Sequence, residues 1–240
     1  MDVAIIGGHG KIALRLARLL TKRGDRVWSI IRKPEQSGHI TAVDATPVWC
    51  DVETTSAVGL AAAIGKVDAV VFAAGAGPGS GPGRKETVDY GCAVKLIQAA
   101  KDNGIDRYVM ISSVGADPEA PGDEIFDVYL RAKGRADQAL IDSGLAYTIV
   151  RPVSLTEDPG DGKVFIGDSV PRGKIPRDDV AVVLAAVLNQ PATIEQTFEV
   201  TDGEEPVEVA LRAVGKDVVI DLREKSVRLA PDDDRVTPDR

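Results

Sequence analysis

The sequence predicts an α/β protein built on one doubly wound, mostly parallel sheet. Short apolar segments alternate with amphipathic helical segments along most of the chain, which is typical of right-handed strand–helix–strand units. Within residues 1–13 an apolar segment, a glycine-rich turn and a helical segment follow one another directly. With 240 residues the chain is long enough for one sizeable domain of this class and too short for two large ones.

The first half of the chain contains four expected strands and three expected helices. The strands are short apolar segments suited to burial on both faces of a sheet. The first helix has an apolar stripe on one face and ends at Gly24, and the third helix ends at Gly104. A loop rich in glycine and proline precedes the third helix at 75–83. We expect strands at 3–6, 26–31, 47–50 and 67–74, and helices at 11–23, 55–64 and 86–103.

The second half continues the alternation. A helix with its stop at Gly144 is followed by a short apolar strand, and a later amphipathic helix has Asp178 in position to cap its first turn. The charged, proline-bearing end of the chain at 231–240 is expected to be flexible. We expect strands at 107–112, 146–150 and 196–200, and helices at 126–143 and 178–188.

Composition excludes several classes of protein. The net charge of −8 disfavours binding to nucleic acid, and no apolar segment approaches the roughly 18 residues that a membrane span needs. The two cysteines are expected to be free, small, buried apolar residues, and with only two histidines we expect no metal site. No signal peptide is evident, so the expected compartment is the cytosol.

The glycine-rich turn has the spacing of a dinucleotide-binding motif. Gly7 permits a tight turn after the first strand, Gly10 has no Cβ to keep a phosphate from the backbone, and Ala13 lets the helix pack closely on the sheet. The free N–H groups at the start of the helix, at Lys11 and Ile12, are expected to face a pyrophosphate.

A second group of residues carries possible chemistry. Ser112 and Ser113 end the fifth strand, and Tyr129 and Lys133 are spaced so that they share one face of the next helix. A free tyrosine has a pKa near ~10, and a neighbouring ammonium group favours the phenolate. Together with a serine hydroxyl that holds a substrate oxygen, this pair is able to transfer a proton while a nicotinamide transfers hydride.

Taken in order, these motifs resemble the short-chain dehydrogenase/reductase superfamily, and most closely its atypical branch of NAD(P)-binding, NmrA-like and flavin-reductase-like proteins. Segments 107–113 and 175–181 are similar to the same branch, and the resemblance covers roughly residues 1–205. It implies a Rossmann fold, a nicotinamide cofactor and a catalytic site. The matching positions are Gly7-x-x-Gly10-x-x-Ala13, Ser113, Tyr129-x-x-x-Lys133 and Arg151-Pro152.

The sequence also departs from the family pattern. Val153 stands where the family has a glycine after Arg-Pro, and the asparagine of classical members has no clear equivalent, since Asp89 and Tyr90 lie where it would be sought. The choice of Ser113 over Ser112 rests on the resemblance alone. Arg151 is open to two interpretations, a contact to an anion or a surface ion pair.

Basic residues at the end of the second strand indicate NADP rather than NAD. Arg32 and Lys33 follow the strand where NAD-preferring sites have a carboxylate, and two cations suit a 2′-phosphate. By resemblance Asp51 and Val52 lie near the adenine, although Asp51 is equally suited to cap a helix. Small residues at the end of the fourth strand are expected to line the cofactor, namely Ala73, Ala74 and Gly75.

The expected protein is therefore an NADP(H)-dependent oxidoreductase for a small carbonyl, quinone or flavin-like substrate. Tyr129 is the expected acid–base group, Lys133 supports it and holds the ribose, and Ser113 orients the substrate. A cofactor part at roughly 1–150 and a small substrate-side part at roughly 151–230 form one domain. The alternatives are a non-catalytic NADP(H)-binding redox sensor and, less favoured because the substrate-side part is small, a nucleotide-sugar epimerase. The oligomeric state is left open.

Overall fold

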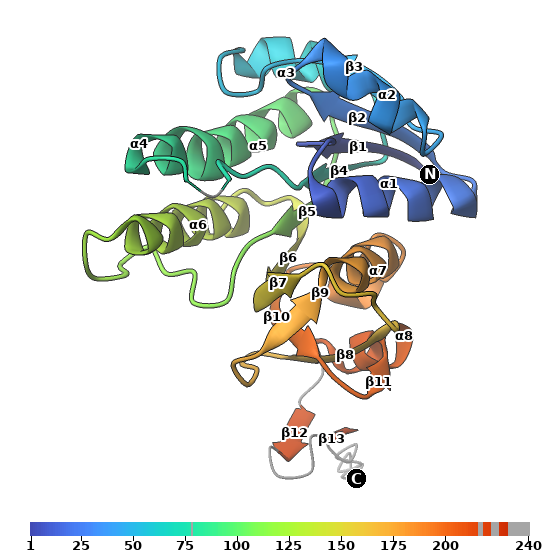
Figure 1. Ribbon diagram of the computed structural model, residues 1–240, viewed down its shortest axis with the longest axis vertical. Coiled ribbons are helices and arrows are strands. Elements are labelled where there is room, and N and C mark those ends of the chain that lie inside the picture. The colour runs from blue at the N-terminus through green and yellow to red at the C-terminus, as the bar shows by residue number, and fades with distance from the viewer. Residues whose placement is uncertain (78, 216–217, 222–225, 230–240) are drawn as a thin grey trace, which may run out of the picture.

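The computed structural model describes residues 1–77, 79–215, 218–221 and 226–229, so the predicted flexible tail lies outside the described residues. A nine-stranded sheet forms the centre, in the order β11-β8-β10-β6-β5-β4-β1-β2-β3 (Figure 1). Its parallel strands are β1 (Asp2–Ile6), β2 (Arg26–Ile31), β3 (Thr46–Trp49), β4 (Ala69–Phe72), β5 (Arg107–Ile111), β6 (Ala146–Pro152) and β10 (Gln196–Asp202).

These parallel strands have the doubly wound order of a Rossmann fold, as the sequence predicts. Two strands that the sequence analysis does not predict extend the sheet antiparallel beyond β10, namely β8 (Lys163–Gly167) and β11 (Glu205–Pro206). The remaining described strands form two small two-stranded sheets. One pairs β7 (Ser154–Thr156) with β9 (Lys174–Pro176), and the other pairs β12 (Val218–Asp221) with β13 (Ser226–Leu229).

Helices cover both faces of the sheet. The long ones are α1 (Lys11–Arg23), α3 (Ala57–Ile64), α5 (Ala93–Asp102), α6 (Ile125–Ile141) and α7 (Arg177–Val187). Short helical turns occupy several of the connections. They are η1 (Pro34–Gln36), α2 (Ser37–Thr41), α4 (Pro82–Arg84), η3 (Pro191–Thr193), α8 (Val207–Ala210) and η4 (Leu211–Ala213).

Two local predictions are wrong. The helix expected at 86–103 is α-helical only from Ala93, because it is preceded by a π-helical segment, η2 (Lys85–Cys92). Asp178 does not cap α7, which begins at Arg177 with Pro176 as its N-cap residue. The side chain of Asp178 instead forms an ion pair with Arg15 of α1.

Alternating apolar residues build a core on each face of the sheet. Val3 and Ile5 of β1 belong to one core cluster with residues of α1 and α7, while Ala4 and Ile6 belong to the other with residues of α3, α5 and α6. The same alternation continues in β4 and β5, and all four residues of β4 are fully buried. Burial on both faces explains why these strands are continuous apolar segments in the sequence.

The sheet topology defines where a ligand is expected to bind. Connections leave β1 and β4 toward opposite sides, and the carboxyl ends of these paired strands meet at one edge, with Ile6 beside Phe72. In open α/β sheets, ligands bind outside the carboxyl ends at such a switch point.

Among the described residues, no helix combines the length and the apolar character that crossing a membrane requires.

Gly134 is a point where packing admits no side chain. It is buried in α6, and a Cβ added there would lie 2.3 Å from the backbone carbonyl carbon of Asp117. We expect Gly134→Ala to lower the free energy of unfolding by about 3 kcal/mol, because overpacking against backbone exceeds the gain in helix propensity. Urea denaturation measures this change. In the control Gly38→Ala the added Cβ meets no atom within 4 Å, and equal losses in the two variants would contradict the argument.

Candidate dinucleotide and substrate site

The glycine-rich turn after β1 is shaped by close contacts that exclude side chains. Gly7 has a φ of 80°, and a Cβ on it would lie 2.7 Å from Ala74 Cα. A Cβ on Gly8 would lie 2.5 Å from Ser29 Cβ, a constraint that the sequence analysis misses although the Gly-Gly pair is its signal. Gly10 is the N-cap residue of α1 and has no side chain to bond the first-turn N–H groups. The turn and helix start therefore leave backbone donors available to an anion.

The side chain of Lys11 takes part in an ionic cluster at the start of α1. Its ammonium group lies 2.8 Å from Glu157, which follows β7. Arg15 and Arg177 bind the same carboxylate, at 3.3 and 2.8 Å. Arg177 therefore forms an ion pair, and the cluster joins the start of α1 to the substrate-side part of the chain.

A cavity of about 150 Å³ lies at the carboxyl ends of β1, β2 and β3. Arg32 is exposed at its rim, whereas Lys33 is not among its lining residues. Asp51 does not cap α3, because Ser56 does so by accepting a hydrogen bond from the Gly59 N–H at 3.1 Å. The structure thus brings together several of the predicted cofactor residues, namely Gly7, Arg32, Asp51, Val52, Ala74 and Gly75.

Glu53 and two cysteines line the same cavity. The Glu53 carboxylate lies 2.7 Å from Arg84, and hydrogen bonds from Arg84 and Thr87 lower the pKa of Glu53. Cys50 and Cys92 are free thiols, as predicted, but only Cys92 is fully buried, since Cys50 is half-buried. Burial raises the pKa of Cys92 to about 11. Cys92 is therefore protonated at neutral pH and is unsuited to act as a nucleophile.

Two larger cavities, of about 690 and 640 Å³, lie next to each other beyond β4 and β5. The first is lined by the predicted residues Ile12, Ala73, Ala74, Gly75 and Lys133. Ser113 lines the second, beside the segment after β6. Tyr129 lines both cavities and so lies between them.

Lys133 and Tyr129 share the helix face that their spacing predicts. The Lys133 ammonium lies 6.0 Å from the centre of the Tyr129 ring and donates a hydrogen bond to the Ile111 carbonyl oxygen at 3.0 Å. It also lies 3.6 Å from the buried carboxylate of Asp89. Asp89 thus occupies the neighbourhood in which the family's asparagine was sought, and it pairs with the lysine.

Lys85 is a site residue that the sequence analysis misses. It is buried in η2, lines the 690 Å³ cavity, and donates to the Gly77 carbonyl oxygen at 3.0 Å. Its ammonium lies 5.4 Å from the centre of the Tyr129 ring, so two ammonium groups lie near this phenol. Lys85 and Asp89 are four residues apart, so both reach one cavity at ordinary helical spacing, but no motif in the sequence marks Lys85.

The two serines after β5 have different environments. Ser112 is buried and donates to Asp137 Oδ2 at 2.8 Å, and the same carboxylate lies 2.9 Å from Arg151. Burial raises the pKa of Asp137. The hydroxyl of Ser113 is half-buried and donates to the adjacent Val114 carbonyl oxygen, at 3.1 Å. Ser113 is therefore freer to turn toward a ligand, and Arg151 forms an ion pair.

The chain's two histidines meet beside the glycine-rich turn, with His9 Nε2 2.7 Å from His39 Nδ1. Burial, and then the charge of His39, lower the pKa of His9. Below about pH 6.5 the unfolded chain therefore binds more protons at this position than the folded one, so stability falls as the pH drops through that window. We expect His9→Gln to flatten the dependence, measured as urea midpoints between about pH 5 and 7. An unchanged slope would contradict this assignment.

The fold and these cavities define a Rossmann protein of the dinucleotide-binding class. The model of a family described as NAD(P)H-binding matches residues 7–191, and the chain belongs to this family. The predicted fold and the predicted nicotinamide-dinucleotide family are thereby confirmed.

Individual relatives agree with this placement. The chain is 37% identical over 213 residues to the uncharacterized sugar epimerase YhfK of Bacillus subtilis, covering 88% of this chain and 99% of that protein. The solved structure of a candidate NAD-dependent epimerase/dehydratase from Bacillus halodurans is 37% identical, with a TM-score of 0.82 and coverage of 88% and 99%. The oxidoreductase ylbE from Lactococcus lactis is 26% identical, with a TM-score of 0.78 and coverage of 89% and 96%.

Proposed function

We propose that this protein is an NADP(H)-dependent oxidoreductase of the atypical short-chain type, acting on a small carbonyl, quinone or flavin-like compound. The observation that carries the proposal is the position of Tyr129, which lines both large cavities and has two lysine ammonium groups near its ring. Membership of the NAD(P)H-binding family supports the nicotinamide cofactor. The unpaired cysteines favour a reducing compartment, and we place the reaction in the cytosol.

The residues at the sheet edge fit a dinucleotide. Gly7 and Gly8 let the turn pack directly against Ala74 and Ser29, and the first-turn N–H groups of α1 are not covered by a capping side chain. The Arg32 guanidinium, at the rim of the 150 Å³ cavity, is able to donate two hydrogen bonds to the 2′-phosphate of the ribose. Lys33, the next residue in the chain, adds positive charge. These cations support the choice of NADP over NAD.

In this mechanism, bound NADPH supplies the hydride that the substrate carbon receives. Tyr129 gives its hydroxyl proton to the substrate oxygen, and the Ser113 hydroxyl orients that oxygen by a hydrogen bond. Lys85 and Lys133 stabilise the phenolate that remains on Tyr129. Lys133 also has ammonium protons left to bond the cofactor ribose, since its one hydrogen bond within the protein is to Ile111 among the described residues.

The test is to measure NADPH binding by the full chain together with NADPH consumption. The substrate panel contains aldehydes, quinones and oxidised flavins, and NADH is run in parallel. Turnover with NADPH is the expected result. Tight binding of NADPH without turnover on a broad panel would favour the redox sensor, which should also distinguish NADP⁺ from NADPH or change its oligomeric state. Absence of nicotinamide binding would refute both functions.

A sugar epimerase is a second candidate because of the relatives. YhfK is named as a sugar epimerase, and the Bacillus halodurans structure as a candidate epimerase/dehydratase. Such a reaction removes and returns a hydride, so it interconverts nucleotide sugars without net use of NADPH. A panel of nucleotide sugars, followed by chromatography with catalytic amounts of cofactor, separates this activity from a reductase.

A further inference from the structure

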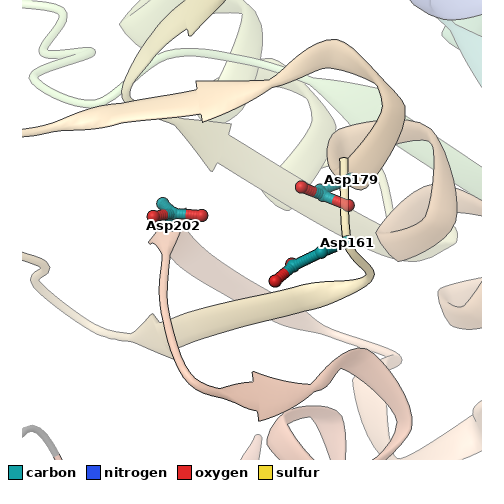
Figure 2. A group of neighbouring side chains, drawn as sticks. All are labelled: Asp161, Asp179 and Asp202. Atoms are coloured by element: carbon teal, nitrogen blue, oxygen red, sulfur yellow. The ribbon is translucent and has the colours of Figure 1, made fainter. Parts of the chain in front are cut away.

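Three carboxylates from distant parts of the chain meet in the substrate-side region. Asp161 precedes β8, Asp179 lies in the first turn of α7, and Asp202 ends β10. One oxygen from each lies within 4.8 Å of the others, and Figure 2 shows the three side chains around one shared space. No ion pair found within the described ranges involves any of the three acids.

Asp179 is the buried member of this group. It is 1% exposed, and its Oδ1 accepts a hydrogen bond from the Gly162 N–H at 2.8 Å. Its Oδ2 is buried and has no hydrogen-bond partner in the part of the chain that the structure describes. An unpaired charged oxygen in the protein interior is costly, and the nearby acids add repulsion, so the arrangement lacks a positive partner.

Glycines hold the surrounding segments close to the acids. A Cβ on Gly160 would lie 2.3 Å from Asp179 Oδ1, so only glycine allows this loop to approach the carboxylate. A Cβ on Gly203, next to Asp202, would lie 2.4 Å from the backbone nitrogen of Phe165. The close approach of Asp161 and Asp202 to Asp179 is therefore built into the backbone.

We propose that Asp161, Asp179 and Asp202 bind a hard divalent cation, with Ca²⁺ as the favoured ion. Carboxylate oxygens are its usual ligands, at roughly 2.3–2.6 Å, so oxygens on opposite sides of the ion lie about 5 Å apart. The spacing of the three acids matches that requirement. Asp161 and Asp202 are exposed, which leaves room for water as further ligands. With two histidines and two cysteines the sequence predicts no metal site, and no short motif unites these three acids.

The bound ion would join the loop before β8 to α7 and to β10. The same loop begins near Glu157, which binds Lys11 and Arg177 beside the candidate site. The cation is thus expected to stabilise the wall of the substrate-side region, and it has no part in the proposed hydride or proton transfer.

The test is a titration of the chelator-treated full chain with CaCl₂, followed by calorimetry and by thermal unfolding. We expect one saturable site and a Tm that rises with the logarithm of the Ca²⁺ concentration. NaCl at equal ionic strength controls for simple screening. Asp202→Asn, at an exposed position, is expected to weaken Ca²⁺ binding by about tenfold or more, because it removes one charged ligand. Asp179→Asn is expected to abolish binding.

Asp168→Asn is the matched control, since it removes an exposed aspartate from the same stretch of chain but outside the group. It should leave the Ca²⁺ affinity unchanged. The proposal is overturned if wild-type protein binds neither Ca²⁺ nor Mg²⁺ at millimolar concentration, or if Asp202→Asn binds Ca²⁺ as wild type does. A Tm rise that NaCl reproduces in full would also overturn it, since the acids would then respond to ionic strength alone.

Discussion

Tyr129→Phe is expected to lower kcat by about 10²- to 10⁴-fold while NADPH still binds with nearly wild-type affinity. The magnitude is that of a lost general acid–base group. Phenylalanine keeps the ring that lies near the Lys85 and Lys133 ammonium groups, so the fold and the cavity walls should persist. The measurement is steady-state turnover on the substrate found by the panel, with cofactor affinity determined on the same samples.

A matched control comes from Tyr147→Phe. Tyr147 lies in β6 outside the residues that line either large cavity, so the same chemical change there should leave kcat unaltered. If Tyr129→Phe retains wild-type turnover, Tyr129 is not the proton donor and the proposed mechanism is wrong. If the variant loses NADPH binding as well, the tyrosine serves the cofactor rather than the substrate.

Arg32→Glu is expected to weaken NADPH binding by about 100-fold and NADH binding only slightly. The variant removes a charge-assisted contact to the 2′-phosphate and adds repulsion, whereas NADH has no phosphate at that position. The glutamate is also placed where NAD-preferring sites carry an acid, so the preference should reverse. Fluorescence titration with both cofactors gives the ratio of the two dissociation constants.

Lys22→Glu makes the same change in net charge at an exposed position in the last turn of α1. This variant should change the affinities for NADPH and NADH only slightly, and by the same factor. A parallel loss of NADPH and NADH affinity in Arg32→Glu would contradict the assignment of Arg32 to the 2′-phosphate.

The parallel sheet was predictable because its strands are buried on both faces. Continuous apolar segments such as β4 are readily assigned as buried strands, because helices that end near Gly24 and Gly144 separate them from one another. The substrate-side strands were not predictable for the opposite reason. β7, β9 and β11 have two or three residues each, which is too short to show an alternating apolar pattern. β8 is placed in the sheet by its pairing with β10, which is distant in the sequence.

The candidate site was predictable where backbone conformation or helix spacing determines it. Gly7 and the Tyr129–Lys133 pair belong to that class. Lys85 does not, because it belongs to no motif and reaches the cavity through the packing of η2 against α6. Asp178 illustrates a further limit: a residue suited to cap a helix is drawn instead to an arginine on a neighbouring helix.

The winding of η2 has a consequence for how this site is able to change. A π turn holds one more residue than an α turn, so η2 is equivalent to an ordinary helix that has acquired an insertion. Each residue in an α-helix turns by about 100°, and the added residue therefore sets the two ends of the helix out of phase. Lys85 and Asp89 reach the cavity while Leu96 and Ala100 keep their places in the core. Removing a single residue from η2 would bring the two ends of the helix back into phase. Either Lys85 and Asp89 would then leave the cavity, or Leu96 and Ala100 would leave the core.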